Sequence, residues 1–396
     1  MVGEIAINKY LIAPTSQFYY CGLPFRIDST SKCTYNCQYC FAKLRGGFRS
    51  QDTCFLESEK LSSRFCSNKS SGIINELISS KMPIHFGGMS DPNCNQYVSD
   101  ITFSSLNTFA SNNYPVVVST KNPEPYLYVH RDYSSTTIIQ VSFSTIDGRL
   151  ANVIEPYAPS PENRIKSIEA LVKHGYKVTA RIQPFLYSLK EEVLGVLIPS
   201  LIDVGVDHVI FEHLKLPVES NARNTFSSLC QKSGISLELY EKHGILYGRS
   251  ILLPNEIKID NILEAKRICE KSGVTFGAGD YGFYHFSSTD CCCGIDKYFP
   301  DSNWFKGNFT NVIKRSKGKE LLVSELEKYE YPNSSISMYI NSHSRIENNS
   351  IKHLLVNKWN KSGTANAIDS YYGIRVDPYL DDKGNHVYVK EKIYEY

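Results

Sequence analysis

Short hydrophobic runs and longer mixed stretches alternate along the first 215 residues of this chain. The short runs are rich in Val, Ile and Phe, which is typical of buried strands. The longer stretches repeat apolar residues every three to four positions, which is typical of amphipathic helices. The strands are predicted at residues 23–28, 84–88, 115–120, 137–144, 177–183 and 207–212. The helices are predicted at residues 73–80, 99–111, 161–174 and 191–204.

The stretch at residues 161–174 carries signals for both ends of a helix. Pro161 suits the first helical position, because the backbone N–H that proline lacks has no partner there. Gly175 follows the last turn, where helices commonly end. The apolar face between these ends consists of Ile165, Ile168, Leu171 and Val172.

Strand and helix follow one another about six times in roughly 200 residues. This alternation predicts a parallel sheet with right-handed crossovers, either a partial or full β/α barrel or a doubly wound sheet. In all of these folds the chemistry lies at the carboxyl ends of the strands. Polar and glycine residues do follow the predicted strands, notably Gly87 and Gly88 after the second and Thr120 and Lys121 after the third.

The rhythm changes after residue 215. Residues 220–272 look mostly helical, residues 274–276 are predicted as one more strand, and the Ser- and Asn-rich residues 332–350 are predicted as a linker or surface loop. Residues 374–389 resemble a hairpin. We therefore expect a core at 15–215, a mostly helical extension at 216–330 and a C-terminal α/β element at 331–396.

The composition is that of a globular protein, because 42% of the 396 residues are hydrophobic and 21% are charged. Disorder is thereby excluded as a global description. No run of about 18 apolar residues is present, so no membrane-spanning helix is predicted. The first 14 residues lack the features of a signal peptide, so we expect a cytoplasmic protein. Lys and Arg exceed Asp and Glu by 43 − 41 = 2, which does not favour coating of nucleic acid by charge alone.

The chain has 12 cysteines. Without a secretion signal we expect thiols, metal ligands or catalytic groups rather than a disulfide framework. Six of them gather at two places in the sequence, namely Cys33, Cys37 and Cys40, and Cys291, Cys292 and Cys293.

The first group has the spacing Cys-x3-Cys-x2-Cys, in the segment CTYNCQYCF. Thiolates are the favoured ligands of iron–sulfur clusters. Three of them hold three corners of a cubane cluster and leave the fourth iron open to a substrate or cofactor. The alternative is a structural zinc loop, which more often has a fourth protein ligand.

At these residues the chain resembles the radical S-adenosylmethionine (SAM) superfamily. The resemblance implies a partial (β/α)6 TIM-like barrel with a C-terminal extension, and a [4Fe–4S] cluster held by Cys33, Cys37 and Cys40. The cluster would take one electron from a flavodoxin- or ferredoxin-like donor and cleave SAM reductively. The 5′-deoxyadenosyl radical would then abstract hydrogen from the substrate. The product radical would be quenched by a thiol or oxidised at a second cluster.

Further segments extend the resemblance over about residues 20–215. The segment 87–92 (GGMSDP) is similar to the glycine-rich segment whose backbone receives the methionine amino group. Met89 stands where that segment commonly has an acidic residue, so Ser90 or Asp91 could take its part. More narrowly, the chain resembles the branch related to spore photoproduct lyase, often labelled DNA repair photolyase-like, at residues 119–123, 141–144 and 155–159 and at Arg164.

The resemblance implies a set of SAM-binding residues. Tyr39 and Phe41 would shield the cluster and contact adenine, and Lys121 and Ser144 would meet the carboxylate or ribose. The ordinary alternatives are glycine turns, a surface lysine, strand serines and, for Glu155 with Arg164, an ion pair at a helix start. The residues carried over are Tyr39, Phe41, Gly87, Gly88, Ser90, Lys121, Ser142, Ser144 and Arg181, with Gln183 as a further candidate beside Arg181.

The second cysteine group, residues 291–293, has three alternative interpretations. Adjacent side chains project in different directions, so three in a row seldom bind one metal. One or two could ligate an auxiliary iron–sulfur cluster together with Cys21, Cys94 or Cys269. One could instead donate a hydrogen atom to a substrate radical, as the lyase family is thought to do. The third interpretation is that these are buried thiols in the core.

Residues next to this group could line a substrate pocket. They include Tyr281, which we place among the catalytic candidates with Cys291, Cys292 and Cys293, because neighbouring tyrosines can relay a radical. The others are Asp280, Tyr284 and His285.

The sequence leaves the substrate and the reaction type, lyase or transferase, open. The lyase-like branch indicates a nucleic acid with a damaged pyrimidine pair, whereas the small net charge speaks against a duplex-binding role. A free nucleotide, a peptide and another small molecule are the alternatives. A zinc- or cluster-stabilised binding module without catalysis is the alternative from a different class.

Overall fold

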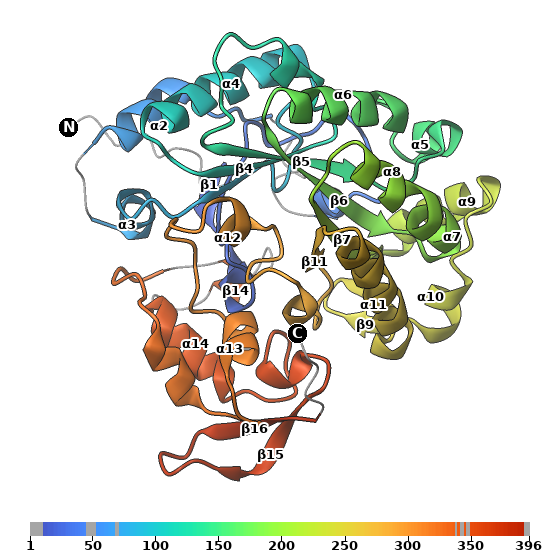
Figure 1. The fold of residues 1–396 in the computed structure, drawn as a ribbon. Helices are drawn as coiled ribbons and strands as arrows, with labels where there is room; N and C mark the ends of the chain where they lie inside the picture. Colours follow the sequence, from blue (N-terminus) through green and yellow to red (C-terminus); the bar gives the residue numbers. More distant parts are fainter. Residues whose placement is uncertain are drawn as a thin grey trace.

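The computed structural model describes residues 11–44, 53–67, 71–336, 339–340, 344–345 and 349–391. Its centre is an eight-stranded sheet with helices packed along it (Figure 1). The strand β1 is antiparallel to β2, and all later neighbours are parallel. In spatial order the strands are β1 (Ile12–Pro14), β2 (Phe25–Ile27), β3 (Ile84–Phe86), β4 (Val116–Thr120), β5 (Thr137–Phe143), β6 (Lys177–Phe185), β7 (His208–His213) and β11 (Thr275–Ala278).

The sheet does not close on itself, because β1 and β11 form its two edges. The later chain ties these edges together. Phe305 donates its backbone N–H to Gly22, just before β2, and Tyr372 donates to Gly282, just after β11, both over 2.9 Å. The α/β class with a mostly parallel sheet, predicted as a partial barrel, is confirmed.

Helices connect the parallel strands, as the alternating pattern predicts. The long segment after β6 is interrupted, because a π-helical stretch, Val193–Leu197, separates α7 from α8. The helices along the sheet are α2 (Ser58–Phe65), α3 (Ile73–Ser79), α4 (Gln96–Ser111), α5 (Gly148–Ile154), α6 (Pro161–Lys173), α7 (Lys190–Glu192), α8 (Ile198–Asp203) and α11 (Asn255–Lys271). Short 3-10 turns are η1 (Ser16–Tyr19), η2 (Phe41–Leu44), η3 (Glu124–Leu127), η4 (Tyr187–Leu189), η6 (Tyr284–Phe286), η7 (Val323–Lys328) and η8 (Ile368–Ser370).

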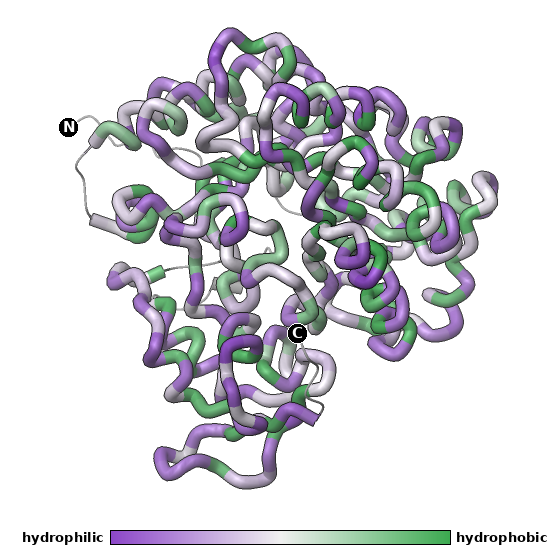
Figure 2. Tube along the Cα trace, in the orientation of Figure 1, coloured by the Kyte–Doolittle hydropathy of each residue, from purple (hydrophilic) through white to green (hydrophobic). Residues whose placement is uncertain are grey.

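The central strands are buried on both faces, which is typical of a parallel sheet covered on both sides. All six residues of β7 are buried, and so are six of the seven residues of β5. The middle of the molecule is accordingly rich in hydrophobic segments in Figure 2. Helices cover one face, and the segment after β11 covers part of the other.

The chain beyond residue 215 is less uniformly helical than its pattern predicts. Its helices are interrupted by a small sheet, and β11 joins the central sheet beside β7. The helices are α9 (Ser220–Lys232), α10 (Glu238–His243), α12 (Ile295–Tyr298), α13 (Phe309–Arg315) and α14 (Ile351–Trp359). The small sheets contain β8 (Leu216–Pro217), β9 (Ile245–Tyr247), β10 (Ser250–Leu252), β12 (Glu320–Leu321), β13 (Tyr339–Ile340), β14 (Ser344–Arg345), β15 (Ile374–Leu380) and β16 (His386–Lys390).

Most sequence-predicted elements are present within a few residues of their predicted ends. The hairpin at 374–389 is β15 with β16, and the predicted strand at 274–276 is β11. The helix predicted from residue 99 begins at Gln96, because the Asn95 side chain caps it by accepting the Val98 N–H over 3.0 Å. The predicted linker at 332–350 lies partly outside the described residues. Within the described ranges, no helix combines the length and the apolar composition needed to cross a bilayer.

Candidate functional site

The predicted cluster ligands lie on the loop that follows β2. Cys37 is buried, and Cys33 and Cys40 are half-buried. All three thiols are free of disulfides and belong to one small apolar cluster with Tyr35 and Cys94. The loop after β2 thus carries three thiols without disulfides, at the end of the sheet where the fold predicts chemistry.

This loop is anchored to the glycine-rich segment after β3. The buried Asp28 carboxylate accepts the backbone N–H groups of Met89 and Ser90 over 2.7 and 3.1 Å. Burial raises the pKa of Asp28, although these two hydrogen bonds and Arg26 oppose that shift. Asp28 therefore fixes the segment that follows Gly88 against the exit of β2.

The two glycines after β3 differ in what they require. Gly87 has a φ of +88°, and a Cβ there would lie 2.6 Å from the Ser119 carbonyl oxygen. A side chain is therefore excluded at Gly87 by both conformation and space. A Cβ on Gly88 would lie 3.6 Å from Arg26 Cδ, which is ordinary contact.

The polar residues next to the glycines hold loops together. Ser90 is buried and donates its hydroxyl to the Thr30 carbonyl over 2.7 Å. Asp91 accepts the Thr120 hydroxyl over 2.8 Å and the Lys121 N–H over 2.6 Å. Asp91 thus joins the ends of β3 and β4, and Ser90 joins the ends of β2 and β3.

Several predicted SAM-binding residues converge on Glu155, which is 1% exposed. Its carboxylate accepts hydrogen bonds from the Tyr39 and Ser144 hydroxyls, the latter over 2.7 Å. It also pairs with Lys121 Nζ over 3.0 Å and with the buried Arg164 over 2.5 Å. Burial alone would raise the pKa of Glu155, but Lys121 and Arg164 hold it well below its ordinary value.

The Glu155 carboxylate therefore links Tyr39 of the cysteine loop to Lys121, Ser144 and Arg164. The ion pair with Arg164 is no exposed pair at a helix start, since both side chains are 1% exposed. The polar ends of Tyr39, Lys121 and Ser144 already have a partner in this carboxylate. Phe41 lies outside this group and is 43% exposed.

A row of polar side chains crosses the concave face of the sheet below this loop. Ser119 on β4 bonds to His85 on β3 over 2.7 Å and to Gln140 on β5 over 2.9 Å. Arg181 on β6 bonds to Gln140 over 3.3 Å and to Glu212 on β7 over 2.9 Å. Burial lowers the pKa of His85 to about 3, so this imidazole is neutral at physiological pH.

Two donors in this row have no partner among the described residues: the side-chain amide of Gln140 and Nε of Arg26. Gln140 is fully buried. The predicted residue Ser142 is aligned with Arg181 across β5 and β6, and both lie on this face. The face can therefore donate hydrogen bonds to a ligand that carries acceptor oxygens or nitrogens.

The second cysteine group lies on the same concave face, towards the amino ends of the strands. Cys291 and Cys293 are buried with Val117, Ile138 and Trp304, and their sulfurs are 3.2 Å apart. Cys21 borders the same cluster, whereas Cys94 lies at the first loop and Cys269 on α11. Of the three cysteines considered as partners for an auxiliary cluster, Cys21 alone lies beside the group.

Two glycines allow this segment to approach the sheet. A Cβ on Gly277 would lie 2.0 Å from the Cys292 carbonyl oxygen, and one on Gly22 would lie 2.7 Å from Cys291 Sγ. His208 Nε2 lies 2.9 Å from the same Cys292 oxygen. A hydrogen bond with Cys291 and burial raise the pKa of Cys292, so its thiol keeps its proton at neutral pH.

The residues next to Cys291–Cys293 that could line a substrate pocket all have partners within the protein. Asp280 accepts the backbone and ring N–H groups of His213, and His285 bonds to the Tyr372 carbonyl. Tyr281 is half-buried, packs against Tyr247 with ring centroids 4.3 Å apart, and accepts the Asn366 N–H. Tyr284 stacks on Tyr20 at 4.5 Å.

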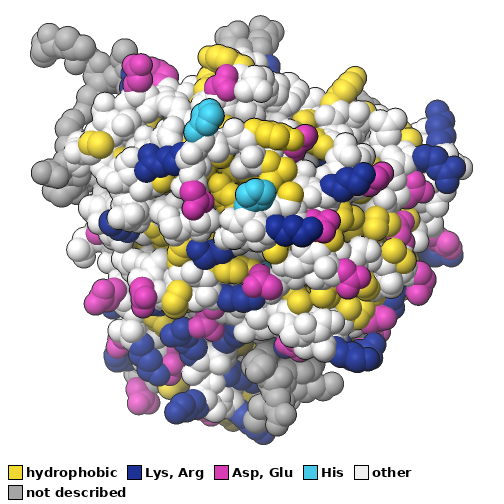
Figure 3. All heavy atoms as spheres, turned by 45° about the horizontal axis from the view of Figure 1, so that its top comes forward, with side chains coloured by type: hydrophobic (Ala, Val, Ile, Leu, Met, Phe, Trp, Pro, Cys, Tyr) yellow, Lys and Arg dark blue, Asp and Glu magenta, His cyan; other side chains and the backbone are white. Residues whose placement is uncertain are grey.

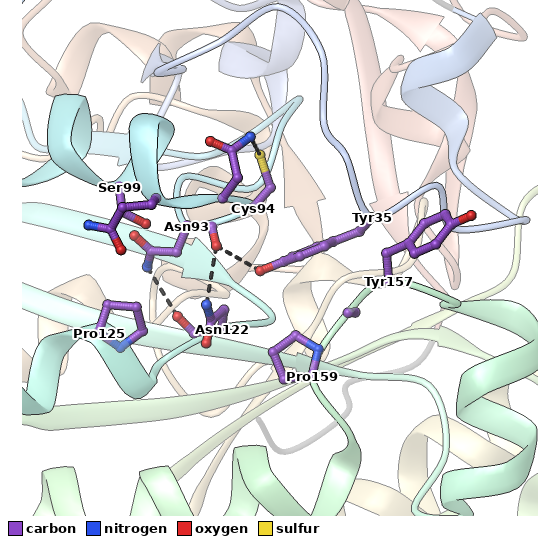
Figure 4. Close-up of a pocket in the computed structure, with 11 residues that line it drawn as sticks. Tyr35, Asn93, Cys94, Ser99, Asn122, Pro125, Tyr157 and Pro159 are labelled. Carbon is purple, nitrogen blue, oxygen red and sulfur yellow. Dashed lines mark hydrogen bonds between the residues drawn. The ribbon is translucent and has the colours of Figure 1, made fainter.

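A cavity of about 380 Å³ borders the first cysteine loop (Figure 4). None of its lining residues is charged. Tyr35 and Cys94 line it next to the loop, and Asn93 and Asn122 exchange side-chain-to-backbone hydrogen bonds at its base. Among the residues of the described ranges, no three His, Cys, Asp or Glu side chains are grouped so as to hold a single metal ion.

Sequence reasoning missed His85 and Gln140, and it did not give Cys94, Asp91 and Glu155 the positions that the fold gives them. Cys94, His85 and Gln140 stand in no motif that marks them. Asp91 stands in the glycine-rich segment and Glu155 in a segment that resembles the lyase branch, but both bind partners from distant loops that the sequence does not reveal. The signal for such residues is a charged side chain next to a strand that is otherwise apolar.

No family model matches this sequence. The uncharacterised protein ORF301 of Acidianus two-tailed virus is 31% identical over 121 residues. The match covers 29% of this chain and 40% of the viral protein, so the chain spans less than half the length of that relative.

Several solved structures are similar to the fold at low sequence identity. A spore photoproduct lyase mutant with bound AdoMet and dinucleoside spore photoproduct has 13% identity and a TM-score of 0.46, with 70% of this chain and 75% of that chain covered. Streptococcus suis SuiB bound to S-adenosylmethionine has 13% identity and a TM-score of 0.37, with 54% and 47% covered. Methylornithine synthase has 13% identity and a TM-score of 0.33, with 48% and 52% covered.

Proposed function

We propose that this chain is a radical SAM enzyme in which Cys33, Cys37 and Cys40 hold a [4Fe–4S] cluster. The observation that carries the proposal is the meeting of three free thiols at the end of β2 with the Gly87 turn at the end of β3. When bound, the cluster supplies the electron that cleaves SAM to a 5′-deoxyadenosyl radical, which abstracts hydrogen from the substrate.

The donor chemistry of the loop fits such a cluster better than a zinc ion. Thiolates are the ligands that iron–sulfur clusters prefer. A zinc site brings four donors to one ion, whereas a cubane cluster lets each thiolate bind a different iron, so its thiolates stand further apart.

The chain's own residues divide the work at this site. The turn at Gly87 and Gly88 presents backbone groups towards the loop, and Asp28 fixes the following N–H groups. Glu155 holds Tyr39 and Ser144, and with them the far end of the cysteine loop. We assign Lys121 first to the charge balance of Glu155, and its ammonium also lies 5.7 Å from the centre of the Tyr39 ring.

The concave face below the loop is the proposed place of hydrogen abstraction. Ser142 and Arg181 line it, and the unpartnered amide of Gln140 is a donor for a substrate carbonyl or for SAM. Arg181 keeps its charge through Glu212, which also pairs with Lys215. Residue Phe41, exposed at the loop's end, remains the proposed cover of the cluster.

Cys292 is the proposed hydrogen donor to the product radical. It is the one half-buried member of its triplet, and its charge interactions reach Arg181 and Glu212 on the concave face. The S–H bond stays intact at neutral pH because the pKa of the thiol is raised. Cys291, Cys293 and Tyr281 are proposed to support it. The second candidate role, an auxiliary cluster, would use Cys21 as its partner.

We propose two kinds of partner, an electron donor and a substrate, and surface charge bears on the second. A flavodoxin- or ferredoxin-like protein would supply the electron. Acidic and basic side chains are interspersed over the face shown in Figure 3, so this face does not favour a duplex. A depression of about 590 Å³ is lined by both signs of charge, because Glu320 and Glu325 stand beside Arg315, Lys317, Lys319 and Lys328. Arg315 pairs with Asp290, and Lys328 pairs with Glu325. A nucleic acid or nucleotide stays the proposed substrate, and its test is binding that weakens steeply with salt.

The experiment that tests the function is anaerobic purification with measurement of iron and sulfide. Dithionite and SAM are then added, and 5′-deoxyadenosine is measured. Four irons per chain with 5′-deoxyadenosine support the proposal, and clearly more than four support the auxiliary cluster. Zinc in place of iron, or iron without SAM cleavage, supports a binding module instead.

A further inference from the structure

Hydrogen bonds to two neighbouring strands fix which way the buried amide of Gln140 faces. Arg181 can only donate hydrogen bonds, so the Gln140 atom that lies 3.3 Å from Arg181 Nη1 is the carbonyl oxygen, Oε1. Ser119 donates its hydroxyl to the same oxygen over 2.9 Å. Because a carbonyl oxygen has two lone pairs, both acceptor positions of Oε1 are filled, and only the amide nitrogen Nε2 is left to bind another group.

This nitrogen is buried on the concave face without a partner. Gln140 is fully buried, and its Nε2 bonds to no atom of the described residues. Ile138 and Ser142 lie two positions away on β5, so they share its face of the sheet. Ile138 packs with Cys291 on the floor of that face, whereas Ser142 lies towards the carboxyl ends of the strands. Nε2 is therefore placed between the floor and the cysteine loop.

A second donor without a partner lies on the same face, on β2. Arg26 is in register with His85 of β3, which belongs to the same polar row as Gln140. Within the described ranges, Nε of Arg26 has no hydrogen-bond partner. The closest approach between the Arg26 guanidinium and Asp28 is 3.7 Å, which is an ion pair but too long for a hydrogen bond. Arg26 thus keeps donors that a ligand can use.

The charged side chains of this row leave one positive charge in excess. Arg181 and the half-buried Lys215 share the carboxylate of Glu212. Arg26 faces the carboxylate of Asp28. Three cationic side chains therefore face two carboxylates, and an oxygen with negative charge on a ligand would complete the balance.

We infer that this part of the concave face binds a carboxylate, phosphate or carbonyl oxygen of the ligand, and that the Gln140 amide is the donor that selects it. Nε2 donates to this oxygen, and Arg26 adds positive charge and a second donor. Burying a donor without a partner is costly, so the ligand oxygen removes a cost that the empty face bears. The inference rests on the proposed function, because it names the chemistry that the ligand of that site presents to the sheet. SAM and a nucleotide substrate both carry such oxygens, and the test separates them.

The test measures the affinity of the anaerobically reconstituted protein for two probes, SAM and uridine 5′-monophosphate, by equilibrium dialysis. In Gln140→Glu the side chain still accepts from Ser119 and Arg181, but it presents an acceptor where the amide presents a donor. We expect the affinity for at least one probe to fall roughly tenfold or more, the effect of losing a hydrogen bond to a charged group. A fall for SAM alone identifies SAM as the source of the oxygen, and a fall for uridine 5′-monophosphate alone identifies the substrate.

Thr137→Val is the matched control. Thr137 lies on the same strand, and its buried hydroxyl also has no partner in the part of the chain that the structure describes. Its side chain points to the opposite face of the sheet, because three positions separate it from Gln140. Both affinities should equal those of the wild type. Arg26→Lys keeps a cation beside Asp28 but lacks Nε, so the same probe should bind roughly two- to fivefold more weakly. This variant decides the case if circular dichroism shows that Gln140→Glu does not fold.

The wild type separates the failure of this inference from that of the proposed function. A wild type that binds neither probe and forms no 5′-deoxyadenosine overturns both. A wild type that cleaves SAM, with unchanged affinities in Gln140→Glu, overturns this inference alone, since a buried water molecule would then occupy the donors. Tighter binding in Gln140→Glu also overturns it, because the ligand would then present a donor. An equal fall in Thr137→Val would trace the effect to the fold and overturn it as well.

Discussion

The molecule carries two groups of cysteines that are held in place in different ways. The loop group, Cys33, Cys37 and Cys40, lies at the carboxyl end of β2 and is supported by buried carboxylates. The interior group is Cys21 with residues 291–293. It lies among apolar side chains of the concave face and is fixed mainly by close backbone approach.

The comparison shows two ways in which a fold fixes cysteine side chains. Carboxylates such as Glu155 form directional bonds to several loops at once, so they can position the loop that carries the three thiols. Apolar surroundings raise the pKa of a thiol, because the thiolate is poorly solvated there. Burial raises the pKa of thiols in both groups, Cys37 and Cys292 among them, so the two groups differ in how they are held in place.

The largest expected effect separates the two groups outright. Replacing Cys33, Cys37 and Cys40 with Ala should abolish bound iron and 5′-deoxyadenosine formation, because each thiolate holds its own corner of the cluster. The measurement is iron and sulfide per chain after anaerobic reconstitution.

The matched variant replaces Cys291, Cys292 and Cys293 with Ala. It should keep four irons per chain and form 5′-deoxyadenosine. Iron that falls in this variant, with iron retained in the first, would reverse the roles assigned to the two groups.

The next largest effect concerns the carboxylate support of the loop group. Glu155→Gln leaves Lys121 and the buried Arg164 without their counter-charge, and breaking a buried pair in this way costs about 3–5 kcal/mol of unfolding free energy. Urea denaturation measures this loss. Glu162→Gln on α6, the helix that carries Arg164, is the control, because this carboxylate is exposed and pairs with Lys166. This variant should be indistinguishable from wild type. An equal loss of unfolding free energy in the two variants would show that the buried Glu155 ion pairs do not stabilise the fold more than an exposed pair does.

The close packing of the interior group predicts a smaller effect. In Gly277→Ala the new Cβ would meet the Cys292 carbonyl, which lies 2.0 Å from its position, so the backbone must move. We expect a loss of about 1–3 kcal/mol, typical of overpacking, and faster alkylation of Cys292 in the native state. Gly195→Ala is the control, because a Cβ there meets nothing within 4 Å. An unchanged alkylation rate in Gly277→Ala would contradict the packing described.

The smallest effect is a pH dependence at the interior group. Burial lowers the pKa of His208 to about 4, below its ordinary value of 6.5. Between these values the unfolded chain binds a proton that the folded chain does not, so stability is full above pH 6.5 and falls towards pH 4. The contribution lost is about 1–2 kcal/mol by pH 5.

The measurement is the unfolding free energy from pH 7.5 to 5 in wild type and in His208→Gln. The variant lacks the titrating group, so its stability should fall less steeply than that of wild type over this range. Parallel curves would mean that His208 is already protonated in the folded chain or remains neutral in both states.

Local sequence patterns predicted most of the strands and helices of the core. Residues 161–174 illustrate why, since proline, the apolar stripe and glycine are all local signals, and α6 ends within one residue of the prediction. The edge strand β1 was not predicted, because three residues are too few for a period. The helix predicted at 191–204 contains a π-helical stretch for which we have no sequence signal.

The sequence by itself determined the identity and spacing of the loop cysteines, because all three lie within one stretch of eight residues. It also determined the parallel class of the sheet through its alternating pattern. The tertiary structure alone decided that Cys94 packs with the loop cysteines, that Glu155 gathers Tyr39, Lys121 and Ser144, and that Cys21 joins Cys291. These contacts link residues from different loops, and their distances depend on how strands are ordered in the sheet, which no local pattern encodes.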